Sequence, residues 1–117
     1  MFVERLEQVA DRIAGTVALA LVARDGIPVE SIRRGENVDL DLLAAELMSQ
    51  VRAVSQNHRE LAVGRVRQLS VTTDRLTLMV SSVTDDYYLM LVLDSDDHVG
   101  RARFELRRAV LLFEKDL

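Results

Sequence analysis

The stretch LVARDGIPVES, residues 21–31, decides the fold because it is typical of a strand, a tight turn and the start of a second strand. Asp25-Gly26 is the dipeptide favoured in two-residue hairpin turns, in which positive φ angles are required. Pro28 has no backbone N–H to donate, and a strand tolerates such a residue at the edge of a sheet. We therefore expect a hairpin whose second strand, residues 27–34, lies at the rim and whose first strand lies inside.

Four further features place the other strands. Residues 16–24 show no polar alternation, and a strand that is apolar on both sides needs cover on both faces, which predicts a central position. Residues 87–93, YYLMLVL, predict a second central strand for the same reason. In residues 75–83, Leu76, Leu78 and Val80 recur at every second position, which is typical of a strand with one apolar face. Residues 63–73 lack a regular alternation of apolar and polar residues, so the strand expected there either contains a bulge or is exposed at one end.

Three segments carry apolar residues at helical spacing, namely residues 2–14, 40–56 and 98–114. Gly15 is suited to end the first helix and Asp39 to cap the second, and one of the acids among residues 94–97 can cap the third. The helix over residues 40–56 is apolar over more than half of its circumference, which indicates two packing partners. Its apolar residues are Leu40, Leu42, Leu43, Ala44, Ala45, Leu47, Met48, Val51 and Val54.

The elements follow the order α-β-β-α-β-β-β-α. Short connections at residues 25–26, 74 and 84–86 make the strands that they join antiparallel. Two strands covered on both faces and three amphipathic helices predict an α/β fold, a five-stranded antiparallel sheet with helices on both faces. The length of 117 residues fits a single domain over residues 1–117.

The composition narrows the functional class. A net charge of −4 argues against a nucleic-acid partner, because binding to phosphates needs an excess of cationic side chains. There is no cysteine, which excludes disulfides, thiolate metal sites and cysteine nucleophiles. The chain has no apolar run of membrane-spanning length, and its first residues lack the features of a signal peptide. We expect a cytoplasmic protein without membrane insertion.

Residues that often carry catalysis or bind ligands are few and scattered. His58 and His98 are the only histidines, and two solvated surface histidines explain them best. The run DSDD at residues 94–97 lacks the glycine and the distal glutamate of a calcium loop and is typical of a turn. None of the five glycines belongs to a phosphate-binding pattern. We expect no enzymatic activity, no catalytic residue, no cofactor and no metal.

The arginines gather in two places. Arg65 and Arg67 are expected on one face of the strand over residues 63–73. Four more arginines, at positions 101, 103, 107 and 108, lie along the last helix, where Glu105 and Asp97 are available for pairing. A charged run of this kind is typical of a solvated helix face.

The surplus apolar width of the helix over 40–56 and the irregular strand over 63–73 predict a homodimer, because open strand edges and exposed apolar patches invite another chain. A single interface that includes this helix and this strand would cover the apolar patch and the open strand edge together. The expected interface residues are Leu40, Leu43, Ala44, Leu47, Met48, Val51, Arg65, Arg67 and Leu69.

The whole pattern resembles the roadblock/dynein light chain family over about residues 3–114. The resemblance rests on the opening amphipathic helix with Gly15, ALALVARDGIPVES, DLDLLAAELMSQV, VTTDRLTLMV and VGRARFELRRAVLLF with Gly100. It implies a small roadblock/profilin-like α/β domain that dimerises through its second helix and third strand and has no enzymatic site of its own. It also implies binding to a Ras-like small GTPase, as for the bacterial MglB-like members.

The partner surface that goes with this resemblance is the exposed flank of the second helix, near Glu46, Ser49, Gln50 and Arg52. Relatives that activate GTP hydrolysis generally carry additional C-terminal sequence, so the resemblance implies binding, with modulation of hydrolysis as an extension. Two other functions stay open. One is a structural adaptor that dimerises in a larger complex without contacting a GTPase. The other is a small-molecule sensor, which would need a roomy pocket with a few polar groups.

Overall fold

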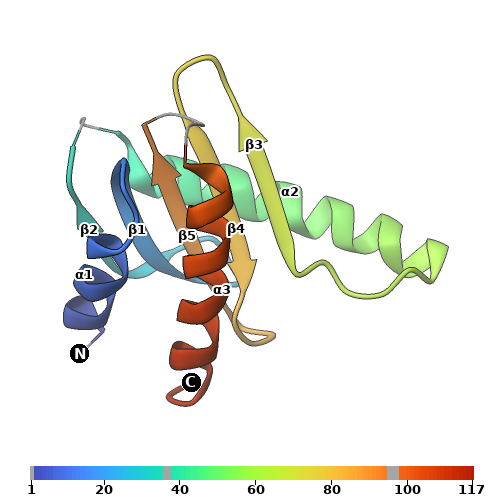
Figure 1. The fold of residues 1–117 in the computed structure, drawn as a ribbon. Helices are drawn as coiled ribbons and strands as arrows, with labels where there is room; N and C mark the ends of the chain where they lie inside the picture. The colour runs from blue at the N-terminus through green and yellow to red at the C-terminus, as the bar shows by residue number, and fades with distance from the viewer. Residues whose placement is uncertain (1, 36–37, 95–97) are drawn as a thin grey trace.

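The computed structural model describes residues 2–35, 38–94 and 98–117, with backbone alone at residues 57–60. Eight elements follow one another in the expected order (Figure 1). They are α1 (Val3–Asp11), β1 (Thr16–Ala23), β2 (Pro28–Arg33), α2 (Leu40–Leu61), β3 (Gln68–Thr72), β4 (Thr77–Ser82), β5 (Tyr87–Leu93) and α3 (Val99–Glu114). No helix within the described ranges combines the length and the apolar character that crossing a bilayer requires.

The strands form one antiparallel sheet in the order β2-β1-β5-β4-β3. The two apolar strands β1 and β5 are central, as their composition predicts, because each is covered on both faces. β2 lies at one edge and begins at Pro28, so the missing N–H of that residue is tolerated. β3 forms the other edge.

The hairpin between β1 and β2 differs from the expected two-residue turn. The backbone N–H of Ala23 donates to the carbonyl of Ile27 at 2.9 Å, which leaves residues 24–26 as a three-residue loop. Gly26 alone in this loop has a positive φ, +93°, as in hairpins that end in a left-handed residue. A Cβ at Gly26 would lie 3.2 Å from the Cα of Ala45, so the loop rests directly on α2. Glycine is therefore required both by its φ and by this close approach.

The sheet divides the core into two layers, as Figure 1 shows, with α1 and α3 on one face and α2 on the other. Alternation along the central strands distributes their side chains between the layers, so that Leu19 and Leu21 meet α1 and α3 whereas Ala18 and Ala20 meet α2. The expected helices on both faces are confirmed. The inner face of α3 is formed by Ala102, Leu106, Ala109 and Phe113, which are fully buried.

Three element boundaries differ from the expectation. α1 ends at Asp11, before Ala14, and the chain then turns through Gly15, whose φ is +84°. α2 continues to Leu61, past the expected end at Gln56. β3 is shorter than residues 63–73, so Arg65 and Arg67 precede the strand and do not lie on its face. The irregular alternation of residues 63–73 thus reflects an exposed approach to a short edge strand.

Candidate functional site

The second helix presents two different surfaces. Asp39 caps it as expected, because its Oδ1 accepts a hydrogen bond from the backbone N–H of Leu42 at 3.1 Å. The stripe that faces the sheet consists of Leu40, Ala44, Leu47, Met48 and Val51, each with at most 5% of its surface exposed. The opposite face is open: Leu42 is 58% exposed, and Ala45, Ser49 and Ala53 are exposed along the same side.

The C-terminal half of α2 extends beyond the sheet. In Figure 1 the helix crosses behind the strands and continues past β3. Val51 is the last buried residue of α2 among the described side chains, although the helix runs on to Leu61. Leu61 is 70% exposed and Val63, just after it, is 63% exposed. The C-terminal part of α2 therefore leaves apolar side chains exposed beyond the sheet.

The edge strand β3 lies beside this overhang with one side of its backbone open. The N–H of Ser82 donates to the carbonyl of Arg67, and the N–H of Thr73 donates to the carbonyl of Leu76, at 2.8 Å each. In an antiparallel ladder the bonding residues alternate, so the N–H and C=O groups of Gln68, Ser70 and Thr72 point away from β4. This row of groups is available to a further strand.

A cleft of about 890 Å³ lies under the overhang, between α2, residues 62–66 and the ends of the central strands. Arg24, Arg52 and Arg65 line it, together with Asp85 and Tyr88. Arg52 donates to the carbonyl of Arg24 at 3.0 Å, and Arg65 forms an ion pair with Asp85 at 2.6 Å. Two of these three guanidinium groups therefore hold the cleft together.

The residues expected at a dimer interface fall into three groups. Leu40, Ala44, Leu47, Met48 and Val51 fill the core of a single subunit, so any contact that α2 makes with a second chain is made by their outward neighbours. Leu43 and Leu69 are half-buried at the rim of the same layer. Arg65 and Arg67 are exposed in the segment that leads into β3.

The residues expected to bind a partner, Glu46, Ser49, Gln50 and Arg52, are all exposed on α2. Only Arg52 lies in the cleft. Sequence reasoning did not identify Arg24, Asp85 and Tyr88 as part of this site, because they come from turns and strand ends that only the folded chain brings next to α2. The signals available in the sequence were the acidic turn at residues 84–86 and Arg24, which precedes Asp25-Gly26.

Catalytic or metal-binding groups do not gather here. Within the described ranges no three His, Cys, Asp or Glu side chains lie close enough to hold a metal ion. His98 precedes α3 and makes no side-chain cap. Asp96 and Asp97, considered above as a cap and as a pairing partner, and the side chain of His58 lie outside the described residues.

Comparison with known proteins gives a consistent result. The family model described as Roadblock/LC7 domain matches residues 2–94. A solved structure of MglB with a tetrameric arrangement is 22% identical, with a TM-score of 0.87 over 97% of this chain and 85% of that one. MglC from Myxococcus xanthus is 29% identical, with a TM-score of 0.73 over 99% of this chain and 98% of that one.

The fold is also similar to that of profilin II from Acanthamoeba castellanii, which is 16% identical, with a TM-score of 0.61 over 92% of this chain and 94% of that one. No curated protein sequence matches the chain. The family model covers most of the chain, from α1 to the end of β5, which includes α2 and β3. The chain therefore belongs to the Roadblock/LC7 domain family.

Proposed function

We propose that this chain is a non-enzymatic regulatory protein that dimerises through α2 and β3 and binds a Ras-like small GTPase on the joint surface. The observation that carries the proposal is the combination of an overhanging helix and an open strand edge on one side of a roadblock domain. Each of these features alone is costly to leave uncovered, and a second copy of the chain covers both.

The geometry of β3 suggests how two copies pair. Two β3 strands that run antiparallel about a two-fold axis through Ser70 would join Gln68 of one subunit to Thr72 of the other. The outward N–H and C=O groups of β3 would then be paired along the whole strand, and the two sheets would become one. On the neighbouring layer, Leu42, Ala45 and Ala53 give α2 a face of apolar and small side chains against which another helix can pack closely.

The contact with the GTPase is proposed on the remaining exposed flank of α2, at Glu46, Ser49 and Gln50, and at Arg52 beside the cleft. This assignment rests on the resemblance to MglB-like regulators and on the exposure of these side chains. Arg52 and Arg65 are already engaged by Arg24 and Asp85. The surface therefore suits binding, with modulation of hydrolysis as an extension of it.

The alternative is a structural adaptor that dimerises in the same way and never contacts a GTPase. The dimer features are equally compatible with it, because the overhang and the open edge are independent of any third protein. The two functions differ only in what the flank of α2 binds.

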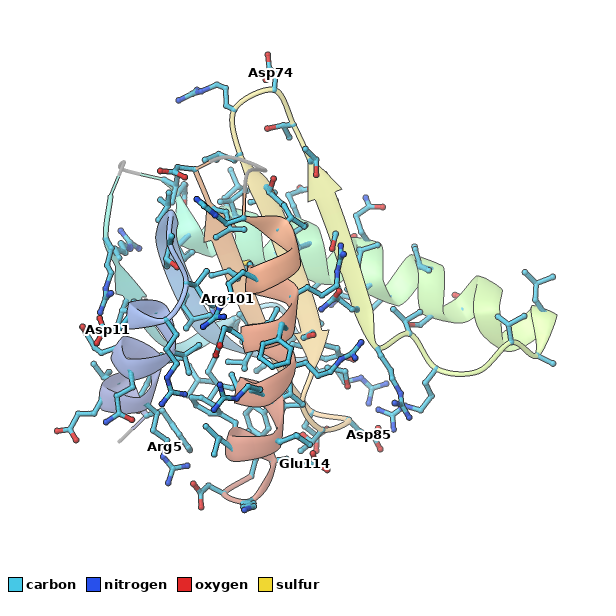
Figure 2. The ribbon with its side chains drawn as sticks, in the orientation of Figure 1. Arg5, Asp11, Asp74, Asp85, Arg101 and Glu114 are labelled. Atoms are coloured by element: carbon cyan, nitrogen blue, oxygen red, sulfur yellow. The ribbon has the colours of Figure 1, made fainter. Side chains whose placement is uncertain are left out.

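A capture experiment separates them. The immobilised chain is incubated with the purified Ras-like small GTPase encoded nearest to it, loaded with GDP or with a non-hydrolysable GTP analogue. We expect capture in at least one nucleotide state and loss of capture by Glu46→Lys. Glu114→Lys, an exposed glutamate on α3 (Figure 2), is the matched control and should bind like the unmodified chain. Absence of capture in both states would leave the adaptor function.

A further inference from the structure

The face of the molecule opposite α2 carries a second recess. A groove of about 230 Å³ lies between α1 and α3, which run side by side across the sheet (Figure 1). Its floor is formed by the buried side chains of Val9 and Phe113. Leu112 borders it and is 46% exposed. The groove is separated from the proposed dimer surface by the whole thickness of the sheet.

The charges of α1 are sorted between its two flanks. Arg5 and Arg12 line the groove. Glu7 and Asp11 are on the other flank, where both form ion pairs with Arg34 of the β2 edge, at 2.9 Å and 2.7 Å. Figure 2 shows Asp11 on the side of α1 away from α3 and Arg5 on the side toward it. Hydrogen bonds to Glu7, and next to Asp11, raise the pKa of Arg34 above its ordinary value. Two of the three acids of α1, Glu7 and Asp11, are thus engaged at the β2 edge, and Glu4 is exposed in the first turn.

The flank of α3 that faces α1 is also cationic. Arg101 and Arg108 share one carboxylate, that of Glu105, at 3.3 Å and 3.4 Å. Glu105 is only 2% exposed, so it is covered by the two guanidinium groups, which themselves reach solvent. Lys115 lines the groove about two turns after Arg108, beside Asp116, which pairs with Arg5. Arg12 and Lys115 have no ion-pair partner among the described residues.

Along this groove three cationic side chains, those of Arg5, Arg12 and Lys115, face one carboxylate, that of Asp116. The chain as a whole has a net charge of −4, so this excess of positive charge is a local arrangement. Exposed apolar side chains are also present on α3, where Phe104 and Leu111 are 56% and 60% exposed. The guanidinium of Arg108 lies 5.9 Å from the ring centre of Phe104. Apolar surface framed by one sign of charge is typical of a recognition site.

We propose that the groove between α1 and α3 binds an acidic segment of a partner protein, with one apolar side chain of that segment seated against Leu112. The volume is below the roughly 300 Å³ at which small-molecule pockets begin, and it suits one anchoring side chain. The unpaired cations Arg12 and Lys115 stand on either side of that position and complement carboxylates that flank the anchor. A helix with acidic residues around an apolar stripe meets these requirements.

The binding test uses a short fluorescent peptide in which two leucines one helical turn apart are set among glutamates. Fluorescence anisotropy with the full chain is expected to show saturable binding that weakens as salt is added. The combined variant Arg12→Glu with Lys115→Glu should weaken binding at least about tenfold, since two attractive pairs become repulsive. Leu112→Ser should weaken it as well, because Leu112 borders the groove.

Arg107→Glu is the matched control, because Arg107 is exposed on α3 but does not line the groove. It should leave the affinity within about twofold of the unmodified chain, as expected for a rim charge that makes no contact. Three results would overturn the proposal: no saturable binding of the peptide, equal weakening by Arg107→Glu and by the groove variant, or binding of the chain to phosphatidylserine vesicles in place of the peptide. A groove variant with half the native mass would assign the groove to self-association and would also overturn it.

Discussion

Two buried threonines illustrate how single atoms set the stability of this domain. The hydroxyl of Thr16 donates to the carbonyl of Ile13 at 2.9 Å and so ties β1 to the turn after α1. The hydroxyl of Thr77, on β4, is buried without a hydrogen-bond partner within the described part of the chain. A buried hydroxyl that gains no hydrogen bond keeps the cost of its lost hydration.

Replacement by valine, which has nearly the same shape, should therefore have opposite effects at these two positions. Thr77→Val should raise the free energy of unfolding by about 1 kcal/mol, since it removes an uncompensated polar group. Thr16→Val should lower it by about 1 kcal/mol, since it leaves a carbonyl unpaired. Urea titration followed by circular dichroism measures both. If Thr16→Val stabilised the chain or Thr77→Val clearly destabilised it, the hydrogen bond of Thr16 or the missing one of Thr77 would be contradicted.

The glycines offer a second matched pair. Gly26 and Gly64 both have strongly positive φ angles, +93° and +99°. A Cβ at Gly26 would approach the Cα of Ala45 to 3.2 Å, whereas a Cβ at Gly64 would meet nothing within 4 Å. Gly64→Ala should cost about 1 kcal/mol through backbone conformation alone, and Gly26→Ala should cost clearly more. Equal losses in thermal or urea unfolding would show that the hairpin does not rest on α2.

Sequence reasoning at the residue scale succeeded where one residue type has one physical reason. Asp25-Gly26 and Pro28 identified the hairpin and the edge strand, although the loop has one more residue than expected. The pairing of Glu105 with arginines of the same helix was expected and is confirmed, but its burial could not be found in this way. A glutamate on an amphipathic helix is usually solvated, and only the folded chain shows that Arg101 and Arg108 cover it.

At the scale of elements, the open edge of β3 can be tested without disturbing the subunit. The N–H of Ser70 points away from β4, so Ser70→Pro removes a donor that only a neighbouring chain would use. We expect the variant to keep the far-ultraviolet spectrum of the fold and to weaken the dimer at least about tenfold. Val71→Pro removes a donor that faces β4 and should destabilise the subunit itself. A dimer of unchanged affinity in Ser70→Pro would contradict pairing through β3.

The central strands were predictable because continuous apolar composition has a single explanation, cover on both faces. The length of α2 was not. Its apolar stripe ends at Val54, and the spacing of apolar residues therefore gave no sign that the helix continues to Leu61. A helix segment that packs against nothing in its own subunit leaves no apolar periodicity from which its length could be predicted.

At the scale of the whole molecule, the sheet separates two surfaces of different character. The face with α2 presents apolar and small side chains and an open strand edge, and it is proposed for self-association. The face with α1 and α3 presents the cationic groove. Because the two lie on opposite sides, charge reversal at Arg12 and Lys115 should leave the mass of the assembly unchanged.

Substitutions at Leu42 and Leu47 distinguish the proposed dimer surface from the core of the subunit. Leu47 is buried against the sheet, so Leu47→Glu should unfold the chain, since burying an unpaired carboxylate costs several kcal/mol. Leu42 points outward, so Leu42→Glu should preserve the circular dichroism spectrum and the unfolding of a single subunit. The pair therefore separates loss of association from loss of folding.

The most direct test of dimerisation is the mass in solution, measured by size-exclusion chromatography with light scattering at micromolar concentration. The unmodified chain should have twice the 13.2 kDa of a single subunit, and Leu42→Glu should have the mass of one folded subunit. A folded monomer of the unmodified chain, or a dimer that Leu42→Glu leaves intact, would contradict the proposal that two copies meet through α2 and β3.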